Sequence, residues 1–397
     1  MVRPLDAEPP VVGRGVANAG GEGEDGLVTL NDDLVFEVLR RVDPVTLATA
    51  SCVNSDFRHL ADNEGLWEKL CNKRWPSTRD ADVKSILSTV GGFKKLYAEC
   101  YPLIVNRELP VLREEDEFVS EDCDLWWEVD DDLDEQRASD LSPSNLISIV
   151  DVVYKGNSVF SRTVEGIPGA DDFLGWFSNC PFRIDLLKSP EEEDERSDHE
   201  NQNAVVIDDD LPSITSVEKE RKDGKFWKAL WDNLRVSWIL INKKKKKMVN
   251  LTSWKPLGGL RHWPCDEDYL IRFGSILPAN RDSLCSAVQC NIVMKCRFAN
   301  LGEGETLKTT LRLTELSMQL EDMGGAHVNG KDSLAILHMA LSCPKSRNHT
   351  DVLDSYHQYL KLQSELKEKK IRHEGRLDTA AVVSGISVFL FVCYFII

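Results

Sequence analysis

The sequence lacks the short motifs that identify the common classes of enzymes and metal proteins. It contains no Gly-x-Ser-x-Gly nucleophile elbow and no Walker A phosphate loop. It also contains no Cys-x-x-Cys pair of the kind that holds structural zinc. We therefore expect a non-catalytic protein that needs no cofactor and no metal. The absence of a fixed-period repeat argues against a solenoid or a propeller.

Basic residues are outnumbered by acidic ones. The chain carries 48 Lys and Arg residues against 66 Asp and Glu residues, a formal net charge of −18. A nucleic-acid-binding protein would present a basic face, so the net charge argues against this class of partner and we expect no nucleic acid. The acidic residues gather in "REEDEFVSEDCD", "EVDDDLDE" and "PEEEDERSDHEN". Such runs are typical of solvated or disordered segments.

The cysteines and the N-terminal sequence bear on the cellular compartment. Eleven cysteines are scattered from Cys52 to Cys393, an odd number without a paired framework. The N-terminal residues include no apolar stretch of a secretory signal. Both observations predict reduced thiols in the cytosol or the nucleus. Cys285, Cys290 and Cys296, with His262 and Cys265 upstream, are the nearest approach to a metal site, but their β-rich context favours buried apolar side chains.

An apolar, helical stretch occupies residues 30–75. Five residues, Leu34, Val35, Val38, Leu39 and Val42, form a wide apolar stripe on a first helix. Asp43-Pro44 is typical of the start of a second helix, with Asp as N-cap and Pro at the first helical position. Ser55 is expected to cap a third. Three helices of this length bury few residues by themselves, so we expect a partner to cover part of their apolar surface.

The same stretch resembles an F-box. It reads Leu-x-x-Asp-Leu-x-x-Glu-Val-Leu-x-Arg-Val-Asp, then Leu-Ala-x-Ala-Ser-Cys-Val, then Phe-Arg-x-Leu and Leu-Trp. Leu30-Asn31 replaces the usual Leu-Pro opening, and Asn54 replaces a common Ser or Cys. Downstream, "SWILINKKKKKMVNLTSWKPLGGLRHW" and "LRLTELSMQLEDMGGAHVNGKDSLAIL" resemble the C-terminal region of a plant F-box subfamily without kelch or leucine-rich repeats.

This resemblance implies a binding surface and a set of partners. In the family, three helices pack on a Skp-type adaptor, which joins the receptor to a cullin and a RING subunit. The positions that face the adaptor or brace the helices are implied to be Leu30, Leu34, Val38, Leu39, Pro44, Leu47, Val53, Phe57, Leu66 and Trp67.

The middle of the chain is rich in β-strand patterns. "LISIVDVVYKGNSVFSRTVEG" predicts two strands joined at Lys155-Gly156-Asn157, and "FWKALWDNLR" predicts a helix before the strand "VSWILI". Later strands are expected in "YLIRFGSIL", "AVQCNIVMKCRFA" and "TLKTTLRLTELSMQLEDM", with "LGEGET" as a hairpin turn. The fold class is therefore α+β: a three-helix F-box, a mostly antiparallel β-rich domain and a C-terminal hydrophobic helix.

Two features of this β-rich part admit more than one interpretation. The run Lys243–Lys247 could form a hairpin loop, a nuclear-import patch or a membrane-surface contact, and the hairpin is favoured. The tryptophans of residues 226–263 could line a substrate groove, but packing in the sheet core is the simpler expectation.

The C-terminal residues 379–397 contain no charge. As a helix they would span about 28 Å, close to the ~30 Å hydrocarbon core of a bilayer. The preceding "KEKKIRHEGR" is rich in Lys and Arg, as expected on a cytosolic flank. We expect a tail anchor on the cytoplasmic face of a membrane. The alternatives are a soluble cytoplasmic or nuclear protein and a buried segment in which Phe389, Phe391, Tyr394 and Phe395 fill a groove.

The expected function follows from the F-box resemblance. The chain would be the substrate-recognition subunit of a Skp–cullin–F-box ubiquitin ligase. The alternative is a membrane-tethered interaction or trafficking protein that uses the F-box for non-degradative assembly. The expected organisation is a leader (1–26), the F-box (27–75), a helical extension (76–110), an acidic linker (111–140), a substrate-recognition domain (141–342) with an acidic loop (189–212), a helix (349–378) and the tail (379–397).

Overall fold

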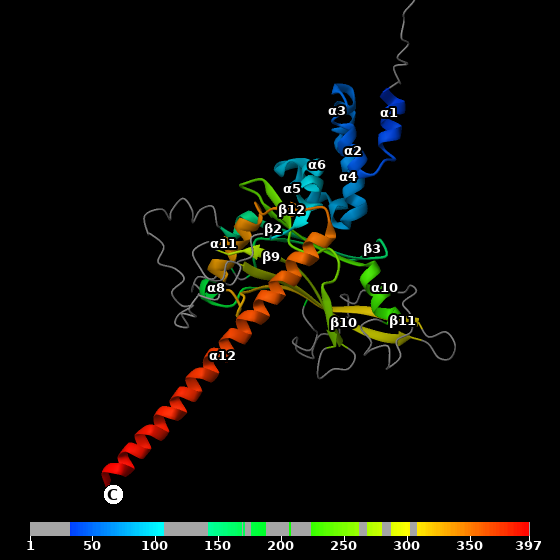
Figure 1. The fold of residues 1–397 in the computed structure, drawn as a ribbon. Coiled ribbons are helices and arrows are strands. Elements are labelled where there is room, and N and C mark those ends of the chain that lie inside the picture. The colour runs from blue at the N-terminus through cyan, green and yellow to red at the C-terminus, as the bar shows by residue number, and fades with distance from the viewer. Residues whose placement is uncertain are drawn as a thin grey trace, which may run out of the picture. The chain divides into compact units, whose positions relative to one another are not determined.

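The computed structural model describes two compact units, which divide between residues 61 and 62. The residues it describes are 32–106, 142–168, 170, 176–187, 206–207, 224–261, 268–279, 287–301 and 308–396. The predicted leader (1–26), the acidic linker (111–140) and the acidic loop (189–212), apart from Val206 and Ile207, lie outside them. Helices come first, antiparallel sheets follow and a long apolar helix ends the chain, so the predicted α+β class is confirmed (Figure 1). The domain boundaries predicted from the sequence stay a prediction.

The first unit consists of three short helices. They are α1 (Asp32–Leu39), α2 (Pro44–Ala50) and α3 (Ser55–Ala61). Asp43 and Pro44 separate α1 from α2, as the sequence predicts. Its few buried apolar residues are Val35, Leu39, Leu47 and Ala61.

The second unit opens with a layer of helices. They are α4 (Glu64–Arg74), the 3-10 turn η1 (Pro76–Arg79), α5 (Ala81–Val90) and α6 (Gly92–Cys100). Val83, Leu87 and Val90 recur on one face of α5 and are buried there. This periodicity lets the layer cover a sheet with one face and meet solvent with the other.

A four-stranded antiparallel sheet lies next to these helices. Its order is β3-β2-β6-β7, with β2 (Leu146–Tyr154), β3 (Asn157–Glu165), β6 (Leu234–Asn242) and β7 (Lys247–Asn250). Lys155 and Gly156 join β2 to β3 with positive φ angles of 48° and 84°. Such angles are typical of the tight turn that matches strand twist, so the predicted hairpin is confirmed.

The strands β2 and β6 are covered on both faces. The helical layer reaches one face, where Ser77 of η1 bonds Asp151 of β2 and the Met248 amide of neighbouring β7 donates to Glu99 of α6 over 2.6 Å. A second sheet covers the other face. All nine residues of β2 are buried in consequence. This double cover explains why "LISIVDVVY" and "VSWILIN" are nearly continuous apolar runs rather than alternating ones.

The second sheet is antiparallel and has the order β4-β11-β10-β9-β8, with β5 also pairing β11. Its strands are β4 (Arg183–Leu187), β5 (Val206–Ile207), β8 (Gly258–Arg261), β9 (Asp268–Pro278), β10 (Ala287–Leu301) and β11 (Lys308–Glu321). Leu301 pairs with Lys308, so "LGEGET" does connect a hairpin, although most of it lies outside the described residues.

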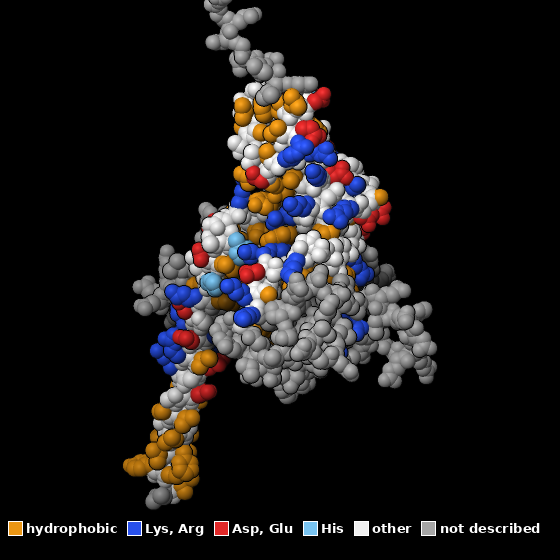
Figure 2. All heavy atoms as spheres, turned by 90° about the vertical axis from the view of Figure 1, so that its right-hand side faces the viewer, with side chains coloured by type: hydrophobic (Ala, Val, Ile, Leu, Met, Phe, Trp, Pro, Cys, Tyr) orange, Lys and Arg blue, Asp and Glu red, His pale blue; other side chains and the backbone are white. Residues whose placement is uncertain are grey.

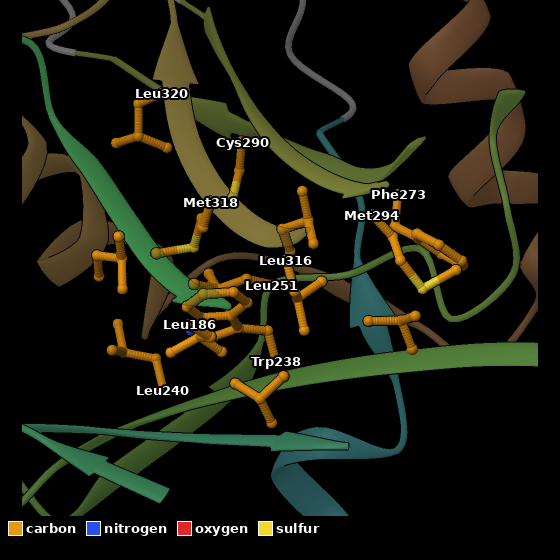
Figure 3. Close-up of a cluster of buried hydrophobic side chains, with 14 of the residues drawn as sticks. Leu186, Trp238, Leu240, Leu251, Phe273, Cys290, Met294, Leu316, Met318 and Leu320 are labelled. Carbon is orange, nitrogen blue, oxygen red and sulfur yellow. The ribbon is translucent and has the colours of Figure 1, made fainter. Parts of the chain in front are cut away.

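The main core lies between the two sheets. Trp238 of β6 is fully buried, and its indole nitrogen donates to the Ser148 hydroxyl over 3.1 Å. Figure 3 shows this indole among side chains from both sheets, including Leu240, Leu251, Leu316 and Met318. The tryptophan therefore packs in the core, as the sequence predicts. Burial of this apolar area is the main favourable term for such a domain.

The two packed sheets are here called the sandwich, and smaller elements cover its ends. They are η3 (Pro143–Asn145), α8 (Trp176–Asn179), α10 (Lys225–Asn233), α11 (Gly330–Ala340) and the short pair β1 (Leu103–Ile104) and β12 (Lys345–Ser346). Trp227 and Leu230 of α10 join the main core, as do Leu334 and Leu337 of α11. The predicted helix "FWKALWDNLR" is confirmed, and it leads directly into β6.

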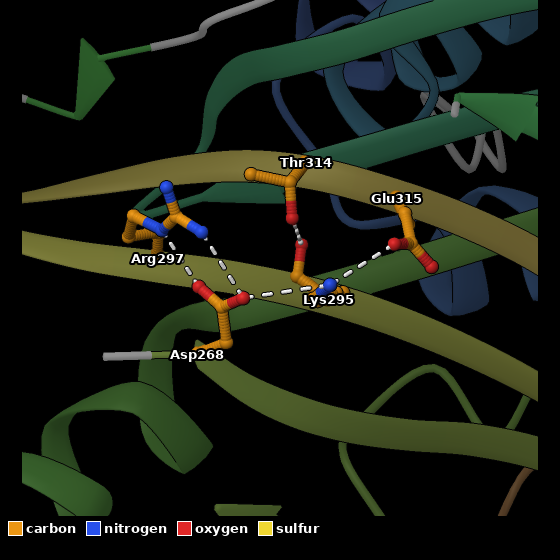
Figure 4. A network of polar contacts seen from close by, with 5 residues as sticks. All are labelled: Asp268, Lys295, Arg297, Thr314 and Glu315. Carbon is orange, nitrogen blue, oxygen red and sulfur yellow. Dashed lines mark hydrogen bonds and ion pairs between the residues drawn. The ribbon is translucent and has the colours of Figure 1, made fainter. Parts of the chain in front are cut away.

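A charged network crosses three strands on the outer face of the second sheet (Figure 4). Asp268 of β9 is buried and accepts two hydrogen bonds from Arg297 of β10, at 2.7 and 3.2 Å. Lys295 bridges Asp268 and Glu315, at 3.4 and 3.1 Å. Although burial opposes its charge, the bonds from Arg297 hold the pKa of Asp268 below its usual range. The network joins the start of β9 to the interior of β10 and β11 and favours the ionised carboxylate.

The C-terminal helix α12 (His349–Ile396) runs unbroken for 48 residues, or about 72 Å. Its first turns belong to the sandwich: Tyr359 is fully buried against Ile276 and Met323, and its hydroxyl donates to the Asp322 carbonyl over 3.0 Å. From Lys367 onward no described side chain of the helix is buried. Figure 1 shows this part, in orange to red, leaving the sheets.

Candidate functional site

Helix α1 separates its apolar stripe into two faces. Val35 and Leu39 are buried, whereas Leu34 and Val38 are 59% and 60% exposed. Each pair is four residues apart and therefore shares one side of the helix. Asp32 and Asp33 lie in the first turn, where negative charge favours the helix dipole. The helix thus uses one pair to hold the unit together and presents the other to its surroundings.

Helix α2 begins where the sequence predicts. The Asp43 carboxylate accepts hydrogen bonds from the amides of Val45 and Thr46, at 2.9 and 3.1 Å. The Thr46 hydroxyl donates to the same side chain, and these bonds lower the pKa of Asp43. Pro44, partly buried, holds the first helical position. Leu47 is the buried residue of this helix, and Val45 is 46% exposed.

The N-cap of helix α3 is one residue earlier than the sequence predicts. The Asn54 side chain, not that of Ser55, accepts the amide of Phe57 over 2.8 Å, so the expected Ser55 cap is wrong. Asn is as good an N-cap as Ser, and here the backbone turn brings Asn54 into position. Val53, in the turn before α3, is 66% exposed, and Phe57 is partly buried. Arg58 donates to the Ser51 carbonyl and ties the turn to α3.

The last two predicted adaptor-binding residues lie in the second unit. Leu66 and Trp67 of α4 are 4% and 3% exposed. The Trp67 ring lies 5.6 Å from the Tyr97 ring of α6, which also contacts Trp75. Both residues therefore brace the helical layer of that unit, and they leave little surface for a partner.

The predicted adaptor-binding residues thus fall into three groups. Leu34, Val38 and Val53 are exposed; Pro44 and Phe57 are partly buried; and Leu39, Leu47, Leu66 and Trp67 are buried. Leu30 lies outside the described residues. Sequence reasoning missed Val45, an apolar residue two positions before the buried Leu47 and therefore on the opposite side of α2. Figure 2 shows hydrophobic side chains on the surface of the first unit, near its charged ones.

The exposed apolar side chains of the first unit are here called the exposed face: Leu34, Val38, Val45 and Val53. Charged groups lie on α1 and in the turn after it, where Glu37 pairs with Arg40 and Arg41 at 3.1 and 3.0 Å. An apolar patch with a charged border is typical of a protein-binding surface. None of the four side chains can act as an acid, a base or a nucleophile, so the face is suited to association only.

The lysine run of the second unit is a hairpin loop. Asn242 pairs with Lys247 across the turn between β6 and β7, which confirms the favoured interpretation. Three of its lysines contact nearby groups: Lys243 pairs with Glu165 at 2.7 Å, Lys245 contacts His338 at 3.0 Å and Lys247 donates to Ser342 at 2.7 Å. Much of the positive charge is therefore held against the protein's own surface.

The buried cysteines of the second sheet behave as apolar side chains. Cys290 and Cys296 of β10 are fully buried in the main core, and burial raises the pKa of both thiols. Cys285, Cys265 and His262 lie outside the described residues. Within the described part of the chain, no three His, Cys, Asp or Glu side chains are grouped so that they could hold a metal ion.

Comparison with known proteins finds similarity to an F-box domain and to plant F-box proteins. The F-box domain model matches residues 27–69. F-box protein At2g27310 of Arabidopsis thaliana is 27% identical over 94% of this chain and 97% of its own length. Probable F-box protein At2g36090 of the same plant is 28% identical over 94% and 93%. F-box protein GID2 of rice is 43% identical over 20% of this chain and 38% of its own length. No solved structure matches the chain.

Proposed function

The chain belongs to the F-box proteins of plants, and on this premise we propose that it is the substrate-recognition subunit of a Skp–cullin–F-box ubiquitin ligase. The observation that carries the proposal is the exposed face of the F-box helices. Leu34, Val38 and Val53 are each more than half exposed, whereas the apolar residues of β2 and β6 are all buried. The proposed partner of this face is a Skp-type adaptor, because F-box domains bind such adaptors.

The proposed mechanism is proximity rather than catalysis. The F-box docks on the adaptor, and through it on a cullin and a RING subunit. The sandwich, about residues 141–342, holds a target protein. Holding the two together raises the local concentration of target lysines near the conjugating enzyme, which accelerates transfer without any chemistry by this chain. The chain needs neither a cofactor nor a metal for this role.

Recruitment of the cullin tests the proposal. Full-length protein in mild detergent is mixed with purified cullin–RING complex, with and without the adaptor, and then captured. We expect cullin to be captured only when the adaptor is present. Binding of the adaptor without the cullin would instead support the alternative of non-degradative assembly. Failure to bind the adaptor would contradict both.

The C-terminal part of α12 supports a location on the cytoplasmic face of a membrane. Within the described part of the chain, α12 is the helix that is long and apolar enough to cross a bilayer. Its apolar end is not buried: Phe389, Phe391, Tyr394 and Phe395 are 63–81% exposed, which does not favour the groove-filling alternative. Lys367, Lys369 and Lys370 precede the span, as anionic headgroups would favour.

Alkaline carbonate extraction tests this location. An integral tail should stay in the membrane pellet, because its apolar surface has no other cover. The matched control is a chain that ends at Asp378, which should be found in the supernatant. Release of the full-length protein by carbonate would contradict the tail anchor and leave the soluble cytoplasmic or nuclear alternative.

A further inference from the structure

Strand β3 forms an edge of the first sheet. The sheet order is β3-β2-β6-β7, and among the described residues no strand pairs with the far side of β3. The Gly166 amide donates to the Leu146 carbonyl over 2.8 Å. Because every second residue of an antiparallel strand bonds the same neighbour, this bond shows which residues of β3 bond to β2. In the register of β2 and β3, residues 160, 162 and 164 therefore face β2. The amides and carbonyls of Ser161, Thr163 and Glu165 point to the open edge.

A groove runs beside this edge. One wall is β3, through Ser161, Thr163 and Glu165, and the other is formed by Asp80, Asp82 and Ile86 at the end of η1 and on α5. The groove therefore places backbone donors and acceptors that no described strand pairs with next to side chains within reach of an added strand. This combination is the requirement for binding an extended peptide by strand addition.

A buried carboxylate holds the two walls in place. Asp151 of β2 accepts the amide and the hydroxyl of Ser77 from η1, at 2.8 and 2.6 Å. It also accepts the hydroxyl of Ser161 from β3 over 2.6 Å. One side chain thus fixes both walls without a ligand. A groove that is already ordered loses less entropy when a peptide binds.

The charge of the groove favours a basic ligand. Its carboxylates are those of Asp80, Asp82 and Glu165, and its cation is Arg162. Lys243 pairs with Glu165, and Arg162 donates to the Leu186 carbonyl. Asp80 accepts the amide of Asp82 as the N-cap of α5, and neither aspartate has an ion-pair partner among the described residues. Two exposed carboxylates remain for cationic side chains of a ligand.

We infer that this groove is the docking site for an extended, basic segment of the target protein, which adds to β3 as an antiparallel or parallel strand. Lys or Arg side chains at alternate positions meet Asp80 and Asp82, because alternate residues of a strand share one face. The inference rests on the proposed function, since it assigns to that receptor the chemistry of its target.

A random decapeptide phage library provides the probe. The full-length protein, bound to its adaptor in mild detergent, is used for selection. We expect enriched peptides to carry Lys or Arg at alternate positions and to lack Pro between them. The enriched peptide is then synthesised, and its affinity is measured by fluorescence anisotropy for the protein and its variants.

Three variants separate the contributions of backbone and charge. Thr163→Pro places a ring on the open edge without removing a β2 ladder bond, and should weaken binding at least about tenfold. Thr163→Val keeps a β-branched side chain and should leave binding unchanged. Asp80→Asn with Asp82→Asn keeps the helix cap and should weaken binding about fivefold, with a smaller salt dependence.

The outcomes decide between this inference and its competitors. Peptides without basic alternation, or equal binding to the protein and Thr163→Pro, would overturn it. If deletion of residues 111–140 raised the affinity for the peptide, the groove would be the binding site of the chain's own acidic segment, and the inference would again be overturned. Adaptor binding is measured separately. If the unmodified protein does not bind the adaptor, the proposed function is refuted. If it binds the adaptor but the peptide experiment fails, only the docking site in the groove is refuted.

Discussion

The F-box helices and the central strands are both rich in apolar residues, but their surroundings differ. All nine residues of β2 are buried, because helices cover one face and a second sheet covers the other. In α1, Val35 and Leu39 are buried while Leu34 and Val38 are more than half exposed. A unit of three short helices has too little interior to bury every apolar side chain. Apolar residues thus form a core between the two sheets, whereas in the F-box helices part of them stays exposed, which is the basis of the proposed partner surface.

The largest effect expected from this comparison is at the centre of the sandwich. Trp238→Ala should lower the free energy of unfolding by about 3–5 kcal/mol, because it leaves a cavity between the sheets and an unpaired Ser148 hydroxyl. Urea unfolding of the full-length protein in detergent, followed by circular dichroism, measures the change. A loss below about 1 kcal/mol would show that the two sheets do not share one core.

A smaller effect is expected inside the F-box unit. Leu47→Ala removes a side chain that is 1% exposed and should destabilise the three helices by about 2–4 kcal/mol. Leu34→Ala is the matched control, and it should change stability by less than about 0.5 kcal/mol because the side chain is exposed. Hydrogen exchange of the amides of α1–α3 measures both. Equal effects would remove the distinction between the buried and the exposed leucine.

The smallest effect is a pH dependence at the junction of helices and sheet. Burial raises the pKa of Asp151, although Ser161 and Ser77 donate hydrogen bonds to it. The folded protein therefore binds this proton more tightly than the unfolded chain does. Protonated Asp151 therefore contributes to stability below the ordinary aspartate pKa, and this contribution is lost as the pH rises through the raised pKa of the folded protein. Asp151→Asn should lack this decline, and unfolding of both proteins at several pH values above 4 tests it. A parallel pH profile for the two would contradict the raised pKa.

Local sequence patterns predicted much of the fold. The Asp43-Pro44 helix start, the Lys155-Gly156 turn and the Asn242–Lys247 hairpin each depend on residues close in sequence, and each is confirmed. The Ser55 cap is wrong because Asn54 and Ser55 are both good caps, and only the backbone turn decides which amide each can reach.

The parts that could not be predicted depend on distant contacts. A stripe of five apolar residues on α1 does not show which pair meets a neighbour, so the exposure of Leu34 and Val38 required the structure. The groove beside β3 depends on β6 pairing the other side of β2, and β6 follows much later in the chain. The sequence also did not show that α12 is continuous. Its charged and apolar halves differ in composition, although one helix contains both.

The central claim is that the exposed face of the F-box helices binds the adaptor. Isothermal titration of purified adaptor into the full-length protein in detergent tests it most directly, with Leu34→Gln and Val38→Gln combined in one variant. Arg40→Gln with Arg41→Gln, in the turn directly after this helix, is the control for an altered surface. We predict that the first variant weakens binding at least about thirtyfold while its unfolding is unchanged, and that the control binds like the parent. Equal affinity of the two variants would contradict the claim.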